Sequence, residues 1–62
     1  MYSIAIKTKN FFDSEFANEE LAKQFSKKGS FMVLHSPSEG FLRSLASRLF
    51  REYSLEAKVY EI

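Results

Sequence analysis

The segment SFMVLH, residues 30–35, constrains the fold more than any other part of the chain. In an extended strand its large side chains divide between two sides, Phe31 and Val33 against Met32 and Leu34. A short run that is apolar on both faces is typical of a central strand of a sheet. We therefore expect this segment to form the middle strand.

The residues that follow predict the start of a helix. Ser36 is a favourable N-cap, Pro37 suits the first helical position, and Glu39 sits at the third, where its side chain can bond to the backbone of the cap. Apolar side chains then recur at helical spacing, namely Phe41, Leu42, Leu45, Ala46, Leu49, Phe50 and Tyr53. We expect this helix to cover residues 37–53.

A second helix is predicted upstream of the central strand, at residues 15–28. Its apolar residues also follow helical spacing: Phe16, Leu21, Ala22 and Phe25. Glutamates crowd its start, two lysines stand at its end and Gly29 follows. This order suits the helix dipole and a left-handed C-terminal stop.

Two further segments alternate in the period of a strand. Residues 2–8 have one apolar and one nearly polar face, so we expect this strand at an edge of the sheet or over solvent. Residues 56–62 predict a C-terminal strand. Residues 9–14 form a short connection, in which we expect at least one of Phe11 and Phe12 to pack onto the core.

Hydrophobic packing must hold these elements together, because a chain of 62 residues without cysteine has no disulfide and no thiolate metal site. A composition of 45% hydrophobic residues, with seven Phe, supplies such a core. We predict one domain, residues 1–62, of the α+β class: a two-layer β-α-β-α-β sandwich with a three-stranded sheet and both helices on one face. The central and last strands should run parallel through a right-handed crossover. The alternative places the helices on opposite faces.

If both helices cover one face, the other face exposes large side chains of the central strand. We expect Met32 and Leu34 to lie there, together with Tyr60 from the last strand. An exposed apolar patch of this kind normally binds a partner.

Three arginines lie on the outer side of the helix at 37–53. Arg43 and Arg51 fall in one row and Arg48 lies beside it. Guanidinium groups in a row can bind phosphates or the carboxylates of a partner protein. The plainer interpretation is a solvated helix face, which any amphipathic helix requires.

His35 is the only histidine, and it stands at the end of the central strand, where α/β sheets commonly place ligands. No cysteine, second histidine or nearby aspartate accompanies it, so the sequence predicts neither a catalytic site nor a metal site. Residues 36–40 could hold an anion, but helix capping already explains them, and no glycine-rich phosphate loop is present. We expect no cofactor and no enzymatic activity.

The balance of charge guides the functional expectation. A net charge of +1 is too small to predict a nucleic-acid partner, and no segment is long and apolar enough for a membrane span or signal peptide, so we expect a cytoplasmic protein without membrane attachment. The leading hypothesis is a small non-enzymatic protein-binding module, acting as an inhibitor, antitoxin or adaptor on a larger partner protein, or forming a homodimer. An origin as a viral or mobile-element accessory protein fits such a chain, although no motif indicates it.

Two other hypotheses stay open at this point. The alternative is a nucleic-acid-binding protein that uses the arginine face of the second helix, favoured only if the arginines converge with Lys23, Lys27 or Lys28 on one surface. A small enzyme centred on His35 ranks last.

Overall fold

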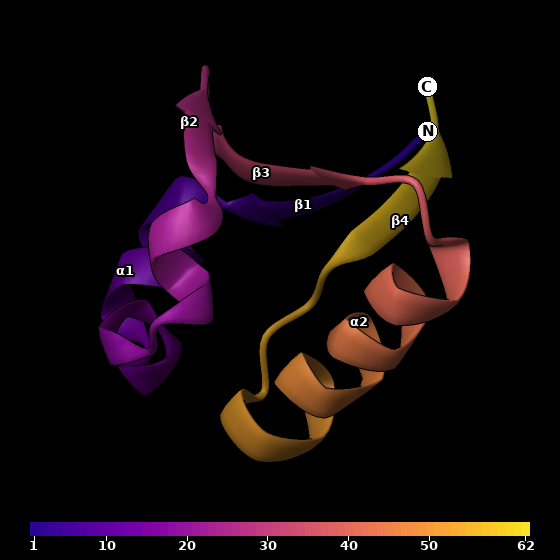
Figure 1. Ribbon diagram of the computed structural model, residues 1–62. Helices are drawn as coiled ribbons and strands as arrows, with labels where there is room; N and C mark the ends of the chain where they lie inside the picture. Colours follow the sequence, from indigo (N-terminus) through magenta and orange to yellow (C-terminus); the bar gives the residue numbers. More distant parts are fainter.

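Strand β1 (Tyr2–Lys7) lies in the interior of the sheet, between β3 (Phe31–Ser36) and β4 (Lys58–Glu61). The computed structural model describes all residues, 1–62 (Figure 1). A fourth strand, β2 (Ser26–Lys28), pairs with the other side of β3, and every neighbouring pair is antiparallel. The sheet therefore has four strands in the order β2-β3-β1-β4, rather than three, and the first strand is central rather than at an edge.

Strands β3 and β4 run in the same direction, because each is antiparallel to β1. The parallel direction expected for them is confirmed, although β1 lies between them. Helix α1 (Thr8–Asp13) follows β1, and helix α2 (Glu39–Tyr53) connects β3 to β4. The α+β class is confirmed, and this β-α-β-β-α-β order is the arrangement of ferredoxin-like domains.

Both helices lie on the same side of the sheet, which makes two layers and rules out helices on opposite faces (Figure 1). Helix α2 begins at Glu39, two residues later than expected. Ser38 is the cap, because its hydroxyl accepts the Phe41 N–H at 3.1 Å, while the Ser36 hydroxyl accepts the Ser38 N–H. The helix ends at Tyr53 as expected, followed by a left-handed residue, Ser54.

The prediction of a helix at residues 15–28 is wrong. The segment forms two single 3₁₀ turns, Glu15–Asn18 and Leu21–Gln24, and then β2. The residues with helical spacing are buried except Leu21, which is half-buried, but two short turns are enough to bury them. The lysines expected at a helix end lie in β2 instead.

Residues 9–14, expected as a connection, fall mostly within helix α1. Phe11 is buried in the core and Phe12 is exposed, which confirms that one of the two phenylalanines packs inward.

Strands β2 and β3 form a hairpin with a two-residue loop, Gly29–Ser30, between the paired residues Lys28 and Phe31. Gly29 has φ +60° at the first loop position, where a II′-type hairpin turn requires glycine. The Thr8 N–H donates a hydrogen bond to the Ser30 carbonyl at 2.9 Å. This bond ties the hairpin loop to the junction of β1 and α1.

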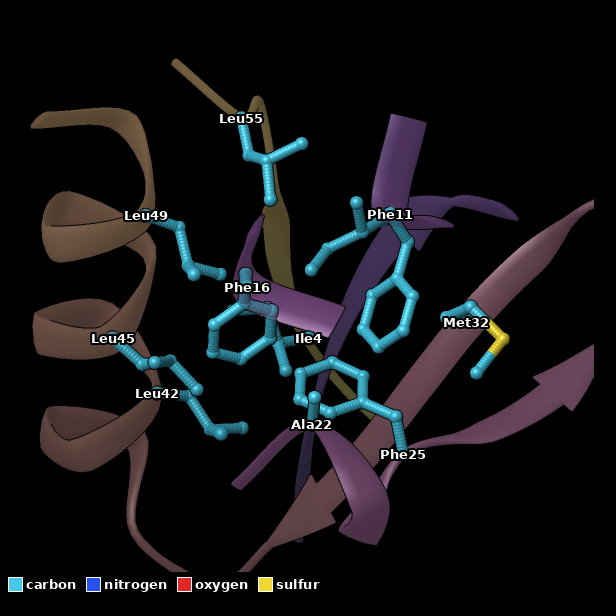
Figure 2. Close-up of a cluster of buried hydrophobic side chains, with 11 residues drawn as sticks. Ile4, Phe11, Phe16, Ala22, Phe25, Met32, Leu42, Leu45, Leu49 and Leu55 are labelled. Carbon is cyan, nitrogen blue, oxygen red and sulfur yellow. The ribbon is translucent and has the colours of Figure 1, made fainter. Parts of the chain in front are cut away.

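The core lies between the sheet and the helices (Figure 2). Leucines of α2 point from one side toward Phe16 and Ile4, and Phe11 and Phe25 lie beside Met32 of β3. Phe16 has no exposed surface, and its ring meets those of Phe11 and Phe25 nearly edge-on, with centroids 5.7 and 5.8 Å away. This aromatic cluster joins the segment around α1 to α2.

The first and last residues are adjacent, because the Ile62 N–H donates to the Met1 carbonyl at 3.0 Å (Figure 1). They lie at the Tyr2 end of β1, whereas the hairpin loop lies at the Lys7 end.

Candidate functional site

The face of the sheet away from the helices is uncovered, and strand register decides which side chains it carries. Ile4 and Ile6 of β1 are buried against the helices, and their cross-strand partners on β3 are Leu34 and Met32. The uncovered face, here called the open face, carries the residues at the alternate positions: Ser3, Ala5, Lys7, Ser26, Lys28, Phe31, Val33, His35, Lys58 and Tyr60.

The open face is hollowed. A concavity of about 660 Å³, here called the open-face concavity, is lined by Ala5, Lys7, Asn10, Lys28, Phe31, Val33, His35, Ser54, Glu56, Ala57, Lys58 and Tyr60. Small residues of the central strand β1 lie between larger ones on β3 and β4. The two aromatic residues, Phe31 and Tyr60, are 42% and 47% exposed. Each therefore offers much of its ring to a ligand.

Lysines gather around this surface. A second hollow of about 500 Å³, here called the hairpin hollow, is lined by Lys7, Thr8, Lys9, Lys27, Gly29, Ser30 and Phe31. Together the two hollows include five of the six lysines of the chain, Lys7, Lys9, Lys27, Lys28 and Lys58. None of the five forms an ion pair, and Glu56 is the only acidic residue lining either hollow. The surface is locally basic although the chain is nearly neutral.

The sequence-based assignment of Met32 and Leu34 to the uncovered surface is wrong. Met32 is 6% exposed in the core, and Leu34 is half-buried on the same covered side. Because β1 is central, its apolar face must meet the helices, and pairing with β1 fixes the side on which each residue of β3 lies. Tyr60 does lie on the open face, together with the exposed Phe31; Val33 points to the same face but is only 6% exposed.

Two of the three arginines on α2 form ion pairs with acidic residues. Arg43 pairs with Glu39 at 2.8 Å. Arg48 donates to both carboxylate oxygens of Glu19, at 2.6 and 2.7 Å, and also to Glu52 at 3.4 Å. Arg51 alone makes no ion pair.

No arginine lines either hollow, and the row lies on α2, which packs on the covered side of the sheet. The arginine face, which the alternative hypothesis combines with Lys23, Lys27 or Lys28, therefore lies outside both hollows, and that hypothesis stays a prediction. Lys23, the sixth lysine, pairs with Glu20 at 3.3 Å.

The Glu19 carboxylate is the centre of a small network. The Tyr53 hydroxyl donates to it, and this bond, followed by those from Arg48, lowers the pKa of Glu19. The same carboxylate raises the pKa of Tyr53 and of Arg48, because it holds each in its protonated form. The network joins the turn before β2 to the end of α2 and has a structural role.

His35 lies on the open face next to Ser3, its partner in the β1–β3 register. No hydrogen bond or ion pair joins His35 to a carboxylate. Ser3 is fully buried between His35 and Tyr60, and its hydroxyl has no hydrogen-bond partner. No group of three or more His, Cys, Asp or Glu residues is placed to hold a metal ion.

A signal for the open face is present in the sequence, although only the structure brings its parts together. The polar side of residues 2–8 includes Lys7, the hairpin brings Lys28 beside Phe31, and Lys58 follows in β4. Lys7 and Lys58 alternate with buried or half-buried residues of their own strands, and Lys28 is placed on this face by its pairing with Phe31.

Comparisons with protein-family models, curated proteins and solved structures found no match. Neither helix has the length and apolar character needed to cross a bilayer.

Proposed function

We propose that this protein binds single-stranded nucleic acid on the open face of its sheet. The observation that carries the proposal is the combination of two half-exposed aromatic rings, Phe31 and Tyr60, with three unpaired lysines on the same face, Lys7, Lys28 and Lys58. Bases of a single strand stack on exposed aromatic side chains, and lysines neutralise the phosphates between them.

The shape of the surface supports this mode of binding. Phe31 of β3 pairs with Lys7 at one end of β1, and Tyr60 of β4 pairs with Ser3 toward the other end, with Ala5 between these two positions. Two bases can therefore stack toward opposite ends of the face, with the small residue Ala5 between the two rings. Stacking of a base on an aromatic ring contributes about 1–3 kcal/mol.

The low net charge does not argue against this proposal, because the charges are segregated. Four of the acidic residues, Glu19, Glu20, Glu39 and Glu52, form ion pairs with cations outside both hollows. A nucleic acid approaching the open face meets the lysines, with Glu56 as the one opposing charge.

Fluorescence anisotropy with labelled oligothymidylate and oligouridylate of about twelve nucleotides tests the proposal directly. We expect Phe31→Ala and Tyr60→Ala each to weaken binding by about 5- to 150-fold, the equivalent of one stacked base. Phe50→Ala is the matched control, because Phe50 is 65% exposed but lies on α2 and lines neither hollow. Its affinity should equal that of the wild type.

Two results would contradict the proposal. One is a Phe31→Ala/Tyr60→Ala double variant that is folded and binds as tightly as the wild type. The other is the absence of oligonucleotide binding by the wild type at about 50 mM salt, where phosphate contacts are strongest.

The protein-binding module expected from the sequence stays a prediction, as do its roles as inhibitor, antitoxin, adaptor, homodimer or viral accessory protein. Strand addition has little support, because both edge strands are short and β2 carries two lysines in three residues. A protein partner on the open face would need an acidic segment. The protein-binding class would be favoured by two results together. The wild type would bind polyglutamate but no oligonucleotide, and the Phe31→Ala/Tyr60→Ala double variant would still bind polyglutamate.

The proposal involves no covalent step, and the expectation that the chain is not an enzyme stays a prediction. The same holds for a cytoplasmic location, which suits a protein that binds single-stranded nucleic acid.

A further inference from the structure

The hairpin hollow lies where two parts of the chain far apart in sequence meet. Residues at the end of β1 and the start of α1 form one side, and the loop between β2 and β3 forms the other. The hydrogen bond from the Thr8 N–H to the Ser30 carbonyl holds the two parts together. The hollow is thus positioned by the fold rather than by a single loop.

The charged residues that line the hairpin hollow are all positive. Lys7, Lys9 and Lys27 line the hollow, none has an ion-pair partner, and no acidic residue lines it. Three ammonium groups around one hollow repel one another unless an anion lies between them. The arrangement therefore favours a ligand that carries negative charge.

A second observation concerns the hydroxyl of Thr8. Its oxygen is buried and has no hydrogen-bond partner in the protein, although Thr8 lines the hollow. Buried hydroxyls without a partner are uncommon, but this oxygen is closed to solvent, so an anion in the hollow would contact it only after the Thr8 side chain rotates outward.

The hairpin hollow also adjoins the open-face concavity, because Lys7 and Phe31 line both. A base stacked on Phe31 would place its own phosphate within reach of the lysines.

We propose that the hairpin hollow, lined by Lys7, Lys9 and Lys27 without any acidic residue, is a phosphate-binding site. Resting on the proposed function, this inference assigns to the hollow one backbone phosphate of the bound strand, next to the base on Phe31. The site would fix the point at which the bound nucleic-acid strand leaves the open face, next to the loop between β2 and β3.

The salt dependence of oligothymidylate binding tests the site. For single strands, each phosphate contact contributes about 0.7 to the slope of log affinity against log salt. The Lys9→Ala/Lys27→Ala double variant should lower this slope by about 0.7 and weaken binding about fivefold at 0.1 M salt. Phe31→Ala should weaken binding and leave the slope unchanged. Lys23→Ala, which removes the lysine outside both hollows, should change neither.

Lys9 and Lys27 are exposed and unpaired, so the double variant should melt at the wild-type temperature. If oligothymidylate binds and the slope of the double variant equals that of the wild type, the phosphate site is overturned while the proposed function stands.

A titration with inorganic phosphate, followed by amide NMR shifts, separates the remaining cases. If the wild type does not bind oligothymidylate but phosphate shifts the amides of Thr8, Gly29 and Ser30, the hollow is an anion site and the proposed function fails. If phosphate leaves these amides unshifted and no oligonucleotide binds, both proposals fail.

Discussion

Replacing Phe16 with alanine should remove most of the stability of this protein. Phe16 has no exposed surface, and its ring contacts those of Phe11, Phe25 and Tyr53 at centroid distances of 5.7, 5.8 and 5.7 Å. Truncating a buried phenylalanine costs about 3–5 kcal/mol, because it removes apolar burial and leaves a cavity. A domain of this length has a total stability of about 3–9 kcal/mol, at roughly 0.05–0.15 kcal/mol per residue. We expect Phe16→Ala to be mostly unfolded or close to it at 25 °C.

Urea unfolding followed by circular dichroism measures the effect. Phe16→Leu keeps much of the volume but loses the edge-on ring contacts, and should cost about 1–2 kcal/mol. Phe12→Ala is the matched control, because Phe12 is exposed and touches only the ring of Phe11 among the aromatics, so it should cost less than about 1 kcal/mol. The reasoning is refuted if Phe16→Ala costs less than Phe12→Ala, or if its free energy of unfolding stays within about 1 kcal/mol of the wild type.

Two further changes test other parts of the fold. Ser54→Gly should raise the melting temperature by about 2–8 °C, because Ser54 has φ +56° and glycine adopts this left-handed conformation without strain; an unchanged or lower melting temperature would contradict this. The pKa of Glu19 is lowered in the folded state, so its stabilisation is present above about pH 4 and is lost as the pH falls further. Glu19→Gln should therefore be less stable than the wild type at neutral pH but lose less stability between about pH 5 and pH 3, and parallel acid unfolding curves would argue against the network.

The elements with strong local signals were predictable from the sequence. Helix α2 carries a broad apolar stripe behind a serine cap, and the first four residues of β3 are apolar on both faces, so both were placed within two residues. Even the cap was assigned to the wrong serine, because Ser36 and Ser38 are both followed by residues that suit a helix start.

The segment 15–28 shows where local patterns fail. Its phenylalanines are buried at helical spacing, but the chain reaches the same burial through two 3₁₀ turns. Strand β2 has the sequence Ser26-Lys27-Lys28, without any apolar residue, and it forms because β3 offers it a partner through the Gly29 turn. This pairing depends on tertiary structure, and the local sequence of β2 does not indicate it.

The candidate site was hidden for a related reason. Alternation along β3 divides Phe31 and Val33 from Met32 and Leu34, but which pair meets the helices depends on pairing with β1. Net charge also conceals how the charges are distributed, because Arg43 and Arg48 pair with acidic residues while the lysines lining the two hollows form no ion pair.

The hydrogen bond between Ile62 and Met1 has a practical consequence for experiments. Both ends leave the sheet at one corner, and the hairpin loop lies at the other end of the six-residue strand β1, about 20 Å away. A fluorophore, an affinity tag or a surface tether attached at either end would stand clear of the hairpin, so a labelled protein can report on a ligand there without the label obstructing it.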